Sequence, residues 1–414
     1  MEILSMYNRA TKYLSKGNYL KALSFFKKEE QSFKELYLNM GNCYRGLNEY
    51  DRAMACYERA ASVNTIFIET GLYGEYPLAL NNIGLLWYAK GDDAMALRYY
   101  NRALTLDPLY CDAIWNYANA MLRSSSCEFG WDKYEYRFKR ESNAVRIEEY
   151  GTRWDGCTSG DKIVVLAEQG LGDKIMFSRY LSCLKAYFSE VWVQCHPSMD
   201  CFYTDYKICR NASESAASIS IPVCSLAQHF GMVDGEWINK GNFNANKFSK
   251  NVLNIGVVWS GSTTHVNNHN RSCTSNYISS LSSYGDLYSL SPDATTAKNV
   301  TALKPSSWTE TVNAVLGLDL VVSVDTSIVH LCGSLGVPCI MVQPLRETDF
   351  RWSGPWYKSV TIIENNDNWD NAFAKVAALL AKMKSDKFER DFLGKTLAEL
   401  QSMTEEQRKE HFNV

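Results

Sequence analysis

The sequence lacks several short motifs that would assign a chemistry directly. It contains no Cys-x-x-Cys pair, no Asp-x-Asp pair, no Gly-x-Ser-x-Gly elbow and no phosphate-binding P-loop. The missing Asp-x-Asp removes the usual carboxylate pair for a metal-bound nucleotide diphosphate, and we expect no metal site. The 13 cysteines are scattered, and Cys332 and Cys339 lie inside apolar runs. They are typical of small core residues in a reducing compartment, not of a disulfide framework.

Long apolar runs and an excess of one charge are also absent. No apolar stretch approaches the roughly 18 residues of a membrane span, and the opening residues Met1, Glu2 and Ile3 do not begin a signal peptide. The formal net charge is only −3, so no overall field attracts nucleic acid or an anionic membrane. We therefore expect a cytoplasmic protein whose 414 residues form two to four domains.

A helical pattern repeats over residues 1–140. Small residues recur where paired helices would touch and aromatic residues fill the gaps, with a period of about 34 residues. The clearest unit contains Gly84, Trp87, Gly91, Ala96 and Tyr100. The pattern resembles the tetratricopeptide repeat (TPR), whose arrays present a groove for a peptide or a neighbouring domain. An unrelated helical bundle is the alternative.

An α/β pattern follows a glycine-containing linker at residues 141–160. Short apolar runs predict strands at residues 162–166, 191–194, 255–259, 287–290, 321–324 and 339–342. They divide into a first half at residues 161–250 and a second half at residues 251–385. The remaining residues, 386–414, predict a C-terminal helix, so that two helices cover about 369–384 and 388–412.

The second half contains the stretch LDLVVSVDTSIVHLCGSLGVPCIMVQP, residues 318–344, which predicts a parallel βαβ unit. Asp325, Thr326 and Ser327 end its first strand, at the edge where open α/β sheets bind ligands. Thr326 or Ser327 is a candidate cap for the helix, whose first amides suit a phosphate group. His330 lies one turn later on the same side. A capped helix without a ligand is the alternative.

The first half contains a second glycine-rich turn. Gly170 and Gly172 allow a sharp turn between a strand and a helix, with Glu168, Gln169 and Asp173 around its mouth. The run Gly-Leu-Gly-Asp-Lys-Ile shares two glycines with a dinucleotide fingerprint but has isoleucine at the third glycine position. This departure disfavours a Rossmann oxidoreductase.

Several motifs in order carry a more specific resemblance. They are GWDKYEYRF, RWDG, LAEQGLGDKIMFSRYL, IGVVWSG followed by Asn270-Arg271-Ser272, VSVDTSIVHLCGSLGVP, and RW…SGPWY. Over about residues 130–382 the chain resembles TPR proteins that carry a heptosyltransferase-like glycosyltransferase domain of the GT-B fold. The resemblance implies a multidomain α plus α/β protein, in which a TPR solenoid precedes a compact GT-B fold of two Rossmann-like halves. The first half would face the acceptor and the second the nucleotide-sugar donor.

The resemblance also implies roles for particular residues. Asp173 matches the general base, and Asp325, Thr326 and His330 match the donor-holding motif. Cations for the departing diphosphate would come from Arg271, Lys174 or Arg346. The complete set of implied substrate-binding residues is Gln169, Gly172, Lys174, Trp259, Ser260, Arg271, Ser289, Leu290, Asp325, Thr326, Ser327, His330 and Arg346. For Asp173 and Arg271, a helix cap and a surface ion pair are the alternatives.

The activity implied is transfer of a sugar from a nucleotide-sugar to an acceptor hydroxyl, with inversion and without a metal or other cofactor. The acceptor class stays open between a protein, a glycan and a hydroxylated DNA base. The TPR groove is expected to hold that acceptor or a separate partner. The alternative to an enzyme is a non-catalytic scaffold protein, whose repeats bind a peptide and whose GT-B domain has only a structural role.

The first prediction concerns metal ions. Because no Asp-x-Asp pair occurs, we expect sugar transfer by this chain to continue after divalent ions are removed. The check is the turnover of a nucleotide-sugar with and without excess EDTA. Complete loss of turnover that Mn²⁺ or Mg²⁺ restores would contradict this expectation.

Overall fold

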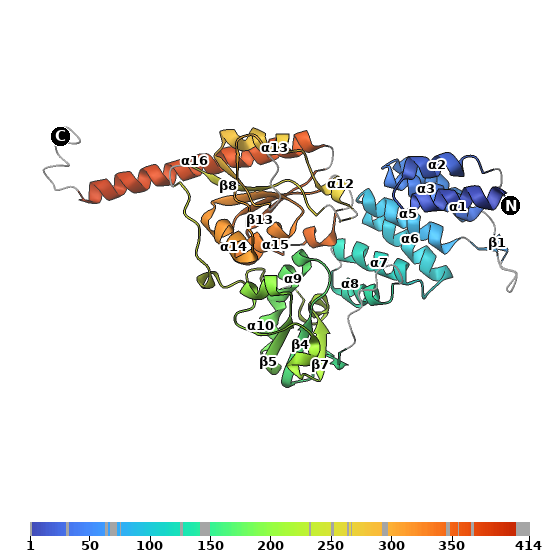
Figure 1. Ribbon diagram of the computed structural model, residues 1–414, viewed down its shortest axis with the longest axis horizontal. Coiled ribbons are helices and arrows are strands. Elements are labelled where there is room, and N and C mark those ends of the chain that lie inside the picture. The colour runs from blue at the N-terminus through green and yellow to red at the C-terminus, as the bar shows by residue number, and fades with distance from the viewer. Residues whose placement is uncertain are drawn as a thin grey trace. The chain divides into compact units, whose positions relative to one another are not determined.

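The structure, a computed structural model, describes the following residues: 2–29, 33–62, 65–66, 73–74, 76–124, 127–140, 150–231, 233–249, 252–262, 265, 267–291, 297–344, 348–354, 356–365 and 368–402. The chain forms two compact units (Figure 1). The repeat unit comprises Met1–Glu149, Ser225–Gly231 and Arg346–Pro355. The α/β unit comprises Tyr150–Cys224, Met232–Leu345 and Trp356–Val414. In the part of the chain that the structure describes, no helix has the length and apolar character needed to cross a membrane.

The repeat unit is built from consecutive helix pairs. Its helices are α1 (Glu2–Leu14), α2 (Tyr19–Phe26), α3 (Lys34–Gly46), α4 (Tyr50–Ser62), α5 (Pro77–Ala89), α6 (Asp93–Leu106), α7 (Cys111–Arg123), α8 (Cys127–Tyr134), the 3₁₀ helix η1 (Glu135–Phe138) and α11 (Leu226–Phe230). Each pair from α1–α2 to α7–α8 packs together, as the repeat pattern predicted. Two short antiparallel strands, β1 (Thr65–Ile66) and β2 (Tyr73–Gly74), interrupt the array between α4 and α5. They lie within residues 65–76, of which 67–72 and 75 lie outside the described residues.

The recurring glycines explain the repeat spacing. A Cβ atom on Gly41 would overlap the Tyr57 ring, and one on Gly84 would overlap the Tyr100 ring. Both tyrosines are fully buried between the paired helices. The glycine of the first helix and the tyrosine of the second therefore form one packing unit, repeated in α3–α4 and α5–α6.

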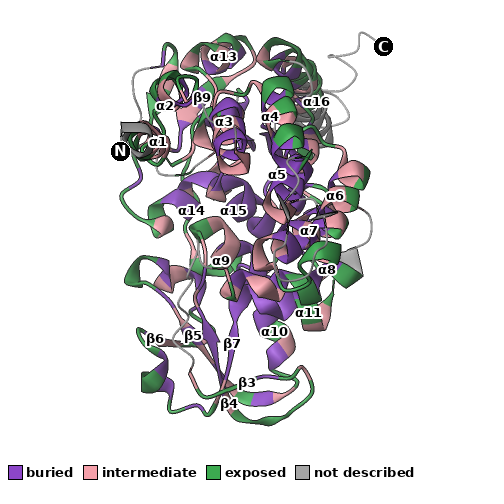
Figure 2. Cartoon of the chain, turned by 90° about the vertical axis from the view of Figure 1, so that its right-hand side faces the viewer, coloured by how far each residue is buried: buried purple, intermediate pink, exposed green. Residues whose placement is uncertain are grey.

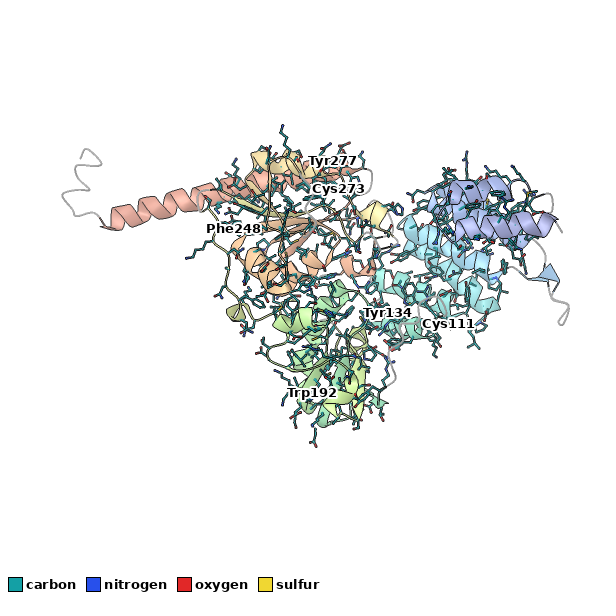
Figure 3. The ribbon with its side chains drawn as sticks, viewed as in Figure 1. Cys111, Tyr134, Trp192, Phe248, Cys273 and Tyr277 are labelled. Atoms are coloured by element: carbon teal, nitrogen blue, oxygen red, sulfur yellow. The ribbon has the colours of Figure 1, made fainter. Side chains whose placement is uncertain are left out.

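A distant piece of the chain completes the repeat unit. We call residues 348–354, which include the 3₁₀ helix η9 (Phe350–Trp352), the anchor segment. The buried Phe350 ring packs edge-on against Trp131 and Tyr134, with centroids 5.8 and 5.6 Å away; Tyr134 is labelled in Figure 3. Arg123 donates from Nη1 to the Thr348 carbonyl at 3.0 Å. The sequence predicts these residues as part of the second half, at residues 251–385, whereas their aromatic contacts attach them to the repeats.

Arg123 is itself firmly held. Its guanidinium pairs with the Asp93 carboxylate, donates to the Tyr88 carbonyl at 2.6 Å and lies 3.4 Å from the Tyr88 ring centre. The Tyr88 hydroxyl donates to the same Thr348 carbonyl at 3.4 Å. Asp93 compensates the charge of Arg123, and carbonyl groups accept its hydrogen bonds. These interactions offset the desolvation cost of burying the guanidinium. The anchor segment thus binds a rigid part of the array.

The α/β unit contains two sheets in which all the paired strands are parallel. The first has the order β3-β7-β4-β5-β6 and the second β10-β9-β8-β11-β12-β13. The strands are β3 (Thr152–Arg153), β4 (Gly160–Leu166), β5 (Phe188–Gln194), β6 (Lys207–Cys209), β7 (Ile219–Pro222), β8 (Asn254–Val258), β9 (Asp286–Ser289), β10 (Val300–Ala302), β11 (Leu320–Val324), β12 (Cys339–Val342) and β13 (Val360–Ile363). The predicted class, a helical repeat region followed by two Rossmann-like halves, is confirmed.

Helices of several lengths connect these strands. The α-helices are α9 (Leu171–Phe177), α10 (Leu181–Leu184), α12 (Asn268–Arg271), α13 (Ser275–Ser279), α14 (Trp308–Gly317), α15 (Ser327–Leu335) and α16 (Trp369–Ser402). The 3₁₀ helices are η3 (Ser178–Tyr180), η4 (Pro197–Phe202), η5 (Ala212–Ser215), η6 (Val223–Ser225), η7 (Lys240–Asn242) and η8 (Ser280–Ser283). Strands β8, β11 and β12 are buried along their whole length. Helix α15 is buried almost throughout (Figure 2). Such continuous burial explains why their sequences are mostly apolar.

The end of the chain differs from its prediction. One helix, α16, covers residues for which the sequence indicated two, and residues 403–414 lie outside the described part. No glycine or proline interrupts the stretch around Ser385 and Asp386, so nothing in the backbone ends the helix there. Lys387 also pairs with both Asp319 carboxylate oxygens at 2.8 Å, which fixes this part of the helix to the second sheet.

The anchor segment gives the second prediction. Phe350→Ala should destabilise the repeat unit by about 3–5 kcal/mol, because it leaves a cavity between Trp131 and Tyr134. Hydrogen exchange of the α7 and α8 amides in the full chain measures the loss. Leu109→Ala is the control, since Leu109 in the same unit is 78% exposed and its truncation should change stability by less than about 0.5 kcal/mol. Unchanged exchange in Phe350→Ala would contradict the anchoring role.

Candidate functional site

The order of the second sheet defines where a ligand is expected. Numbered within this half, its strands run 3-2-1-4-5-6, and the chain reverses direction across the sheet between β8 and β11. Val258 of β8 pairs with Ser323 of β11, so the loops that follow these strands begin side by side. Open α/β sheets bind ligands in the crevice at such a reversal.

The predicted donor residues lie at this edge. Trp259 and Ser260 follow β8, and Asp325, Thr326 and Ser327 follow β11. Ser289 ends β9 and Leu290 follows it, and Ser289 pairs with Val257 of β8. Because the three strands are parallel neighbours, the structure brings all these residues to one edge of the sheet. Trp259, Ser289, Leu290 and Thr326 are buried there, whereas Ser260 is exposed.

Thr326 behaves differently from its predicted role as a cap. It occupies the N-cap position of α15 in extended backbone, with φ −147° and ψ 169°, but its side chain makes no capping hydrogen bond. Its hydroxyl instead lies 3.0 Å from Ser323 Oγ in β11. The Thr326 side chain therefore ties the turn to the strand and leaves the first-turn amides of α15 to other acceptors.

Arg271 supplies a cation beside these strand ends. It closes the short helix α12, and its guanidinium lies against Gly261, where a Cβ atom would stand 2.6 Å from Nε. Within the described residues its buried Nε has no hydrogen-bond partner and no carboxylate pairs with it. The Arg271 guanidinium thus packs against Gly261, and its Nε–H can donate a hydrogen bond to a ligand. Arg346 lies outside the described residues.

In the first half, the predicted turn follows β4 and opens into α9. Gln169 adopts a left-handed backbone with φ 56°, a conformation that non-glycine residues rarely adopt. The Asp173 carboxylate accepts a hydrogen bond from the Gly170 N–H at 3.0 Å through Oδ2, so it does cap the helix. Lys174 is partly exposed on the same turn.

Glu168 is buried next to this turn. Its Oε1 accepts from the Cys224 N–H at 3.0 Å, beyond the end of β7. Leu166 of β4 pairs with Pro222 of β7, so this bond joins the loops at the ends of two neighbouring strands. Glu168 therefore has a structural role at the point where the first sheet reverses its order.

The two halves meet at the starts of α9 and α15. A Cβ atom on Gly172 would lie 2.8 Å from His330 Cδ2, 3.4 Å from His330 Nε2 and 3.5 Å from Ser327 Cα. The structure thus brings Gly172, Ser327 and His330 together, with Asp173 next in the chain. Burial raises the pKa of Tyr357, and the Asp173 carboxylate adds to the increase, which places that carboxylate within electrostatic range of the phenol.

Sequence reasoning missed two residues at this meeting point, Arg179 and Tyr357. The Tyr357 hydroxyl lies 3.0 Å from His330 Nδ1, and burial raises the pKa of Tyr357 to about 12. Arg179 is fully buried, with its guanidinium 4.5 Å from the Tyr357 ring centre. The only available signal was that Tyr357 ends the SGPWY motif and Arg179 lies inside LAEQGLGDKIMFSRYL. Among the described residues, no group of three or more His, Cys, Asp or Glu side chains could hold a metal ion.

Comparison with known proteins identifies the repeats. Models of the tetratricopeptide repeat match residues 35–64 and 77–110, so the chain carries TPR repeats, as the sequence predicted. Protein FlbA of Caulobacter vibrioides is 25% identical over 182 residues, which cover 34% of this chain and 29% of FlbA. The chain thus spans less than a third of the length of this relative.

Solved structures give more distant likenesses. Escherichia coli heptosyltransferase WaaC with ADP is 13% identical, with a TM-score of 0.40, and covers 53% of this chain and 99% of WaaC. A mutant Thermobaculum terrenum O-GlcNAc transferase is 10% identical, with a TM-score of 0.36 over 94% of this chain and 92% of its own. MamA is 17% identical, with a TM-score of 0.27 over 35% and 76%. At TM-scores below 0.5 these likenesses carry no assignment of activity.

The contact between α9 and α15 gives the third prediction. Gly172→Ala should destabilise the α/β unit by about 1–3 kcal/mol, because the new methyl group meets the buried His330 ring. Gly170→Ala is the matched control in the same turn, since it has a negative φ and its methyl group would approach only the Asp173 carboxylate, at 3.2 Å. Urea unfolding followed by tryptophan fluorescence compares the two variants. Equal stability would show that α9 moves away from α15 without cost.

Proposed function

We propose that this chain is a glycosyltransferase that moves a sugar from a nucleotide-sugar to an acceptor hydroxyl, with inversion and without a metal ion. The observation that carries the proposal is the contact between Gly172 on α9 and His330 on α15. This contact sets an acidic turn from one Rossmann-like half beside a helix start from the other. A transfer reaction needs a base and an anion-stabilising group facing a common substrate, and the two turns supply them.

The donor diphosphate is assigned to the turn between β11 and α15. The start of α15 offers amides and the positive end of the helix dipole, which favour phosphate oxygens. The buried Arg271 Nε beside Gly261 adds a donor that lacks a partner in the described residues. Ser289 and Leu290 at the end of β9 would border the nucleoside. Together these groups stabilise the charge that collects on the diphosphate as it leaves.

Asp173 is assigned as the general base. It would accept the proton of the acceptor hydroxyl while that oxygen bonds to the anomeric carbon and the bond from that carbon to the diphosphate breaks. Attack and departure on opposite faces of the sugar invert the anomeric configuration. The capping bond from Gly170 uses Oδ2, and a carboxylate has acceptor capacity on both oxygens, so capping is compatible with catalysis.

The acceptor is assigned to the groove of the TPR array. TPR arrays commonly bind extended peptides, which makes a protein side chain one of three acceptor classes, beside a glycan and a hydroxylated DNA base. The twelve cysteines whose side chains are described are all free thiols. This fits the reducing conditions of a cytoplasmic location.

The fourth prediction tests the proposal through Asp173. Asp173→Asn preserves an acceptor for the Gly170 N–H but removes the basic carboxylate. We expect kcat to fall about 10²–10⁴-fold, with donor affinity and thermal stability nearly unchanged. The measurement begins with a screen of nucleotide-sugars for turnover by the wild-type chain and continues with kcat and KM of the variant.

Two results would count against this assignment. A kcat for Asp173→Asn within about threefold of wild type would leave Asp173 with its capping role alone, at about 1 kcal/mol. If no nucleotide-sugar is bound or turned over by the wild-type chain, the alternative of a TPR scaffold with a structural α/β part takes the place of the enzyme.

A further inference from the structure

We propose that Tyr357 is a positioning residue that holds His330 in the tautomer carrying its proton on Nε2. In this form His330 presents an N–H group at the contact between α9 and α15. The inference depends on the proposed function only for what that N–H would bind, namely a phosphate oxygen of the donor. The tautomer itself is a property of the unliganded chain.

The hydrogen bond between the two side chains is the first step. The Tyr357 hydroxyl and His330 Nδ1 lie 3.0 Å apart, and both residues are buried. Burial raises the pKa of Tyr357 to about 12, so the phenol keeps its proton at neutral pH. A neutral imidazole has one donor and one acceptor nitrogen. When the phenol donates to Nδ1, the imidazole proton resides on Nε2.

The acid–base character of the two groups decides which side chain donates. A neutral imidazole nitrogen is a much stronger base than a phenol oxygen, so the phenol is the favoured donor and His330 Nδ1 the favoured acceptor. Burial raises the pKa of Tyr357, and the positive charge of Arg179, 4.5 Å from the ring centre, acts against this increase and so strengthens the phenol as a donor. The phenol proton is therefore directed to His330 Nδ1.

The position of the phenol is fixed on both sides. A Cβ atom on Gly333 of α15 would overlap the Tyr357 ring, so the ring lies directly on the helix that contains His330. Arg179 covers the ring from η3, and it is held by the carbonyls of Met176 at 2.8 Å and Trp356 at 2.9 Å. Neither side chain can rotate without breaking these contacts.

The opposite edge of the imidazole is where the N–H is needed. Nε2 lies 3.4 Å from the position of a Cβ atom on Gly172, while Ser327 Cα lies 3.5 Å from that position. The N–H on Nε2 thus lies beside the first turn of α15, to which the proposed function assigns the diphosphate. Tyr357 would increase donor affinity through His330, without touching the donor itself.

The tautomer is measured directly by long-range ¹H–¹⁵N correlation spectra of the histidine side chains in the full-length, unliganded chain. His330→Gln identifies the His330 signals by their disappearance. We expect the Nε2-protonated pattern in the wild-type chain, which requires no variant of Tyr357 to fold. An Nδ1-protonated pattern in the wild-type chain would overturn the proposal.

Tyr357→Phe then removes the hydroxyl and keeps the ring. We expect the His330 spectrum to lose its single tautomer and the affinity for ADP, UDP or GDP, measured by calorimetry, to fall about tenfold. The matched control is Tyr203→Phe, which removes a buried phenol bonded to Ser178 Oγ at 3.0 Å in the same unit. It should alter neither the His330 spectrum nor the affinity by more than about twofold.

The outcomes separate this inference from the proposed function. An unchanged His330 spectrum in Tyr357→Phe would overturn the positioning role. A changed spectrum, together with no binding of any nucleoside diphosphate to the wild-type chain, would support the positioning role and contradict the proposed donor site.

Discussion

The close approach of α9 to α15 at Gly172 is the constraint on which the candidate site depends. Each helix begins where its own parallel sheet reverses strand order, so each start is an expected ligand position by itself. A side chain at residue 172 would overlap His330. Because glycine has no side chain, the starts of α9 and α15 can lie in contact. Gly172 therefore has a steric reason to be glycine, whereas the backbone at Gly170, with φ −78°, does not require one. The site is shared between the two Rossmann-like halves.

The anchor segment connects the repeat unit to this site through the chain itself. Phe350 and Thr348 are held by α5, α7 and α8, and Trp356 and Tyr357 follow the anchor segment within a few residues. These two residues contact Arg179, and Tyr357 contacts His330. The chain between β12 and β13 therefore contributes residues first to the repeat unit and then to the α/β unit. This explains why a loop between two core strands is rich in aromatic and charged residues.

Local patterns predicted most of the fold, because strand and helix periodicity depends on neighbouring residues. The βαβ unit around Asp325 and the glycine–tyrosine spacing of the repeats are of this kind. The anchor segment and the Arg179–Tyr357–His330 group depend on contacts between residues 27 to 260 positions apart, which no local pattern contains. Thr326 was misjudged because Ser323, three residues earlier, competes for its hydroxyl. The predicted break within α16 was wrong, since no glycine or proline around Ser385 and Asp386 ends the helix there.

The double use of Asp173 follows from the physics of its turn. A flexible carboxylate loses conformational entropy when it is ordered for proton transfer, which raises the barrier. The bond from the Gly170 N–H to Oδ2 removes much of that freedom before any substrate binds. Gln169, held at φ 56°, keeps the turn in one backbone conformation at some cost in stability. A capping bond is therefore not evidence against catalysis at this position, since it orients the carboxylate that the proposed reaction uses.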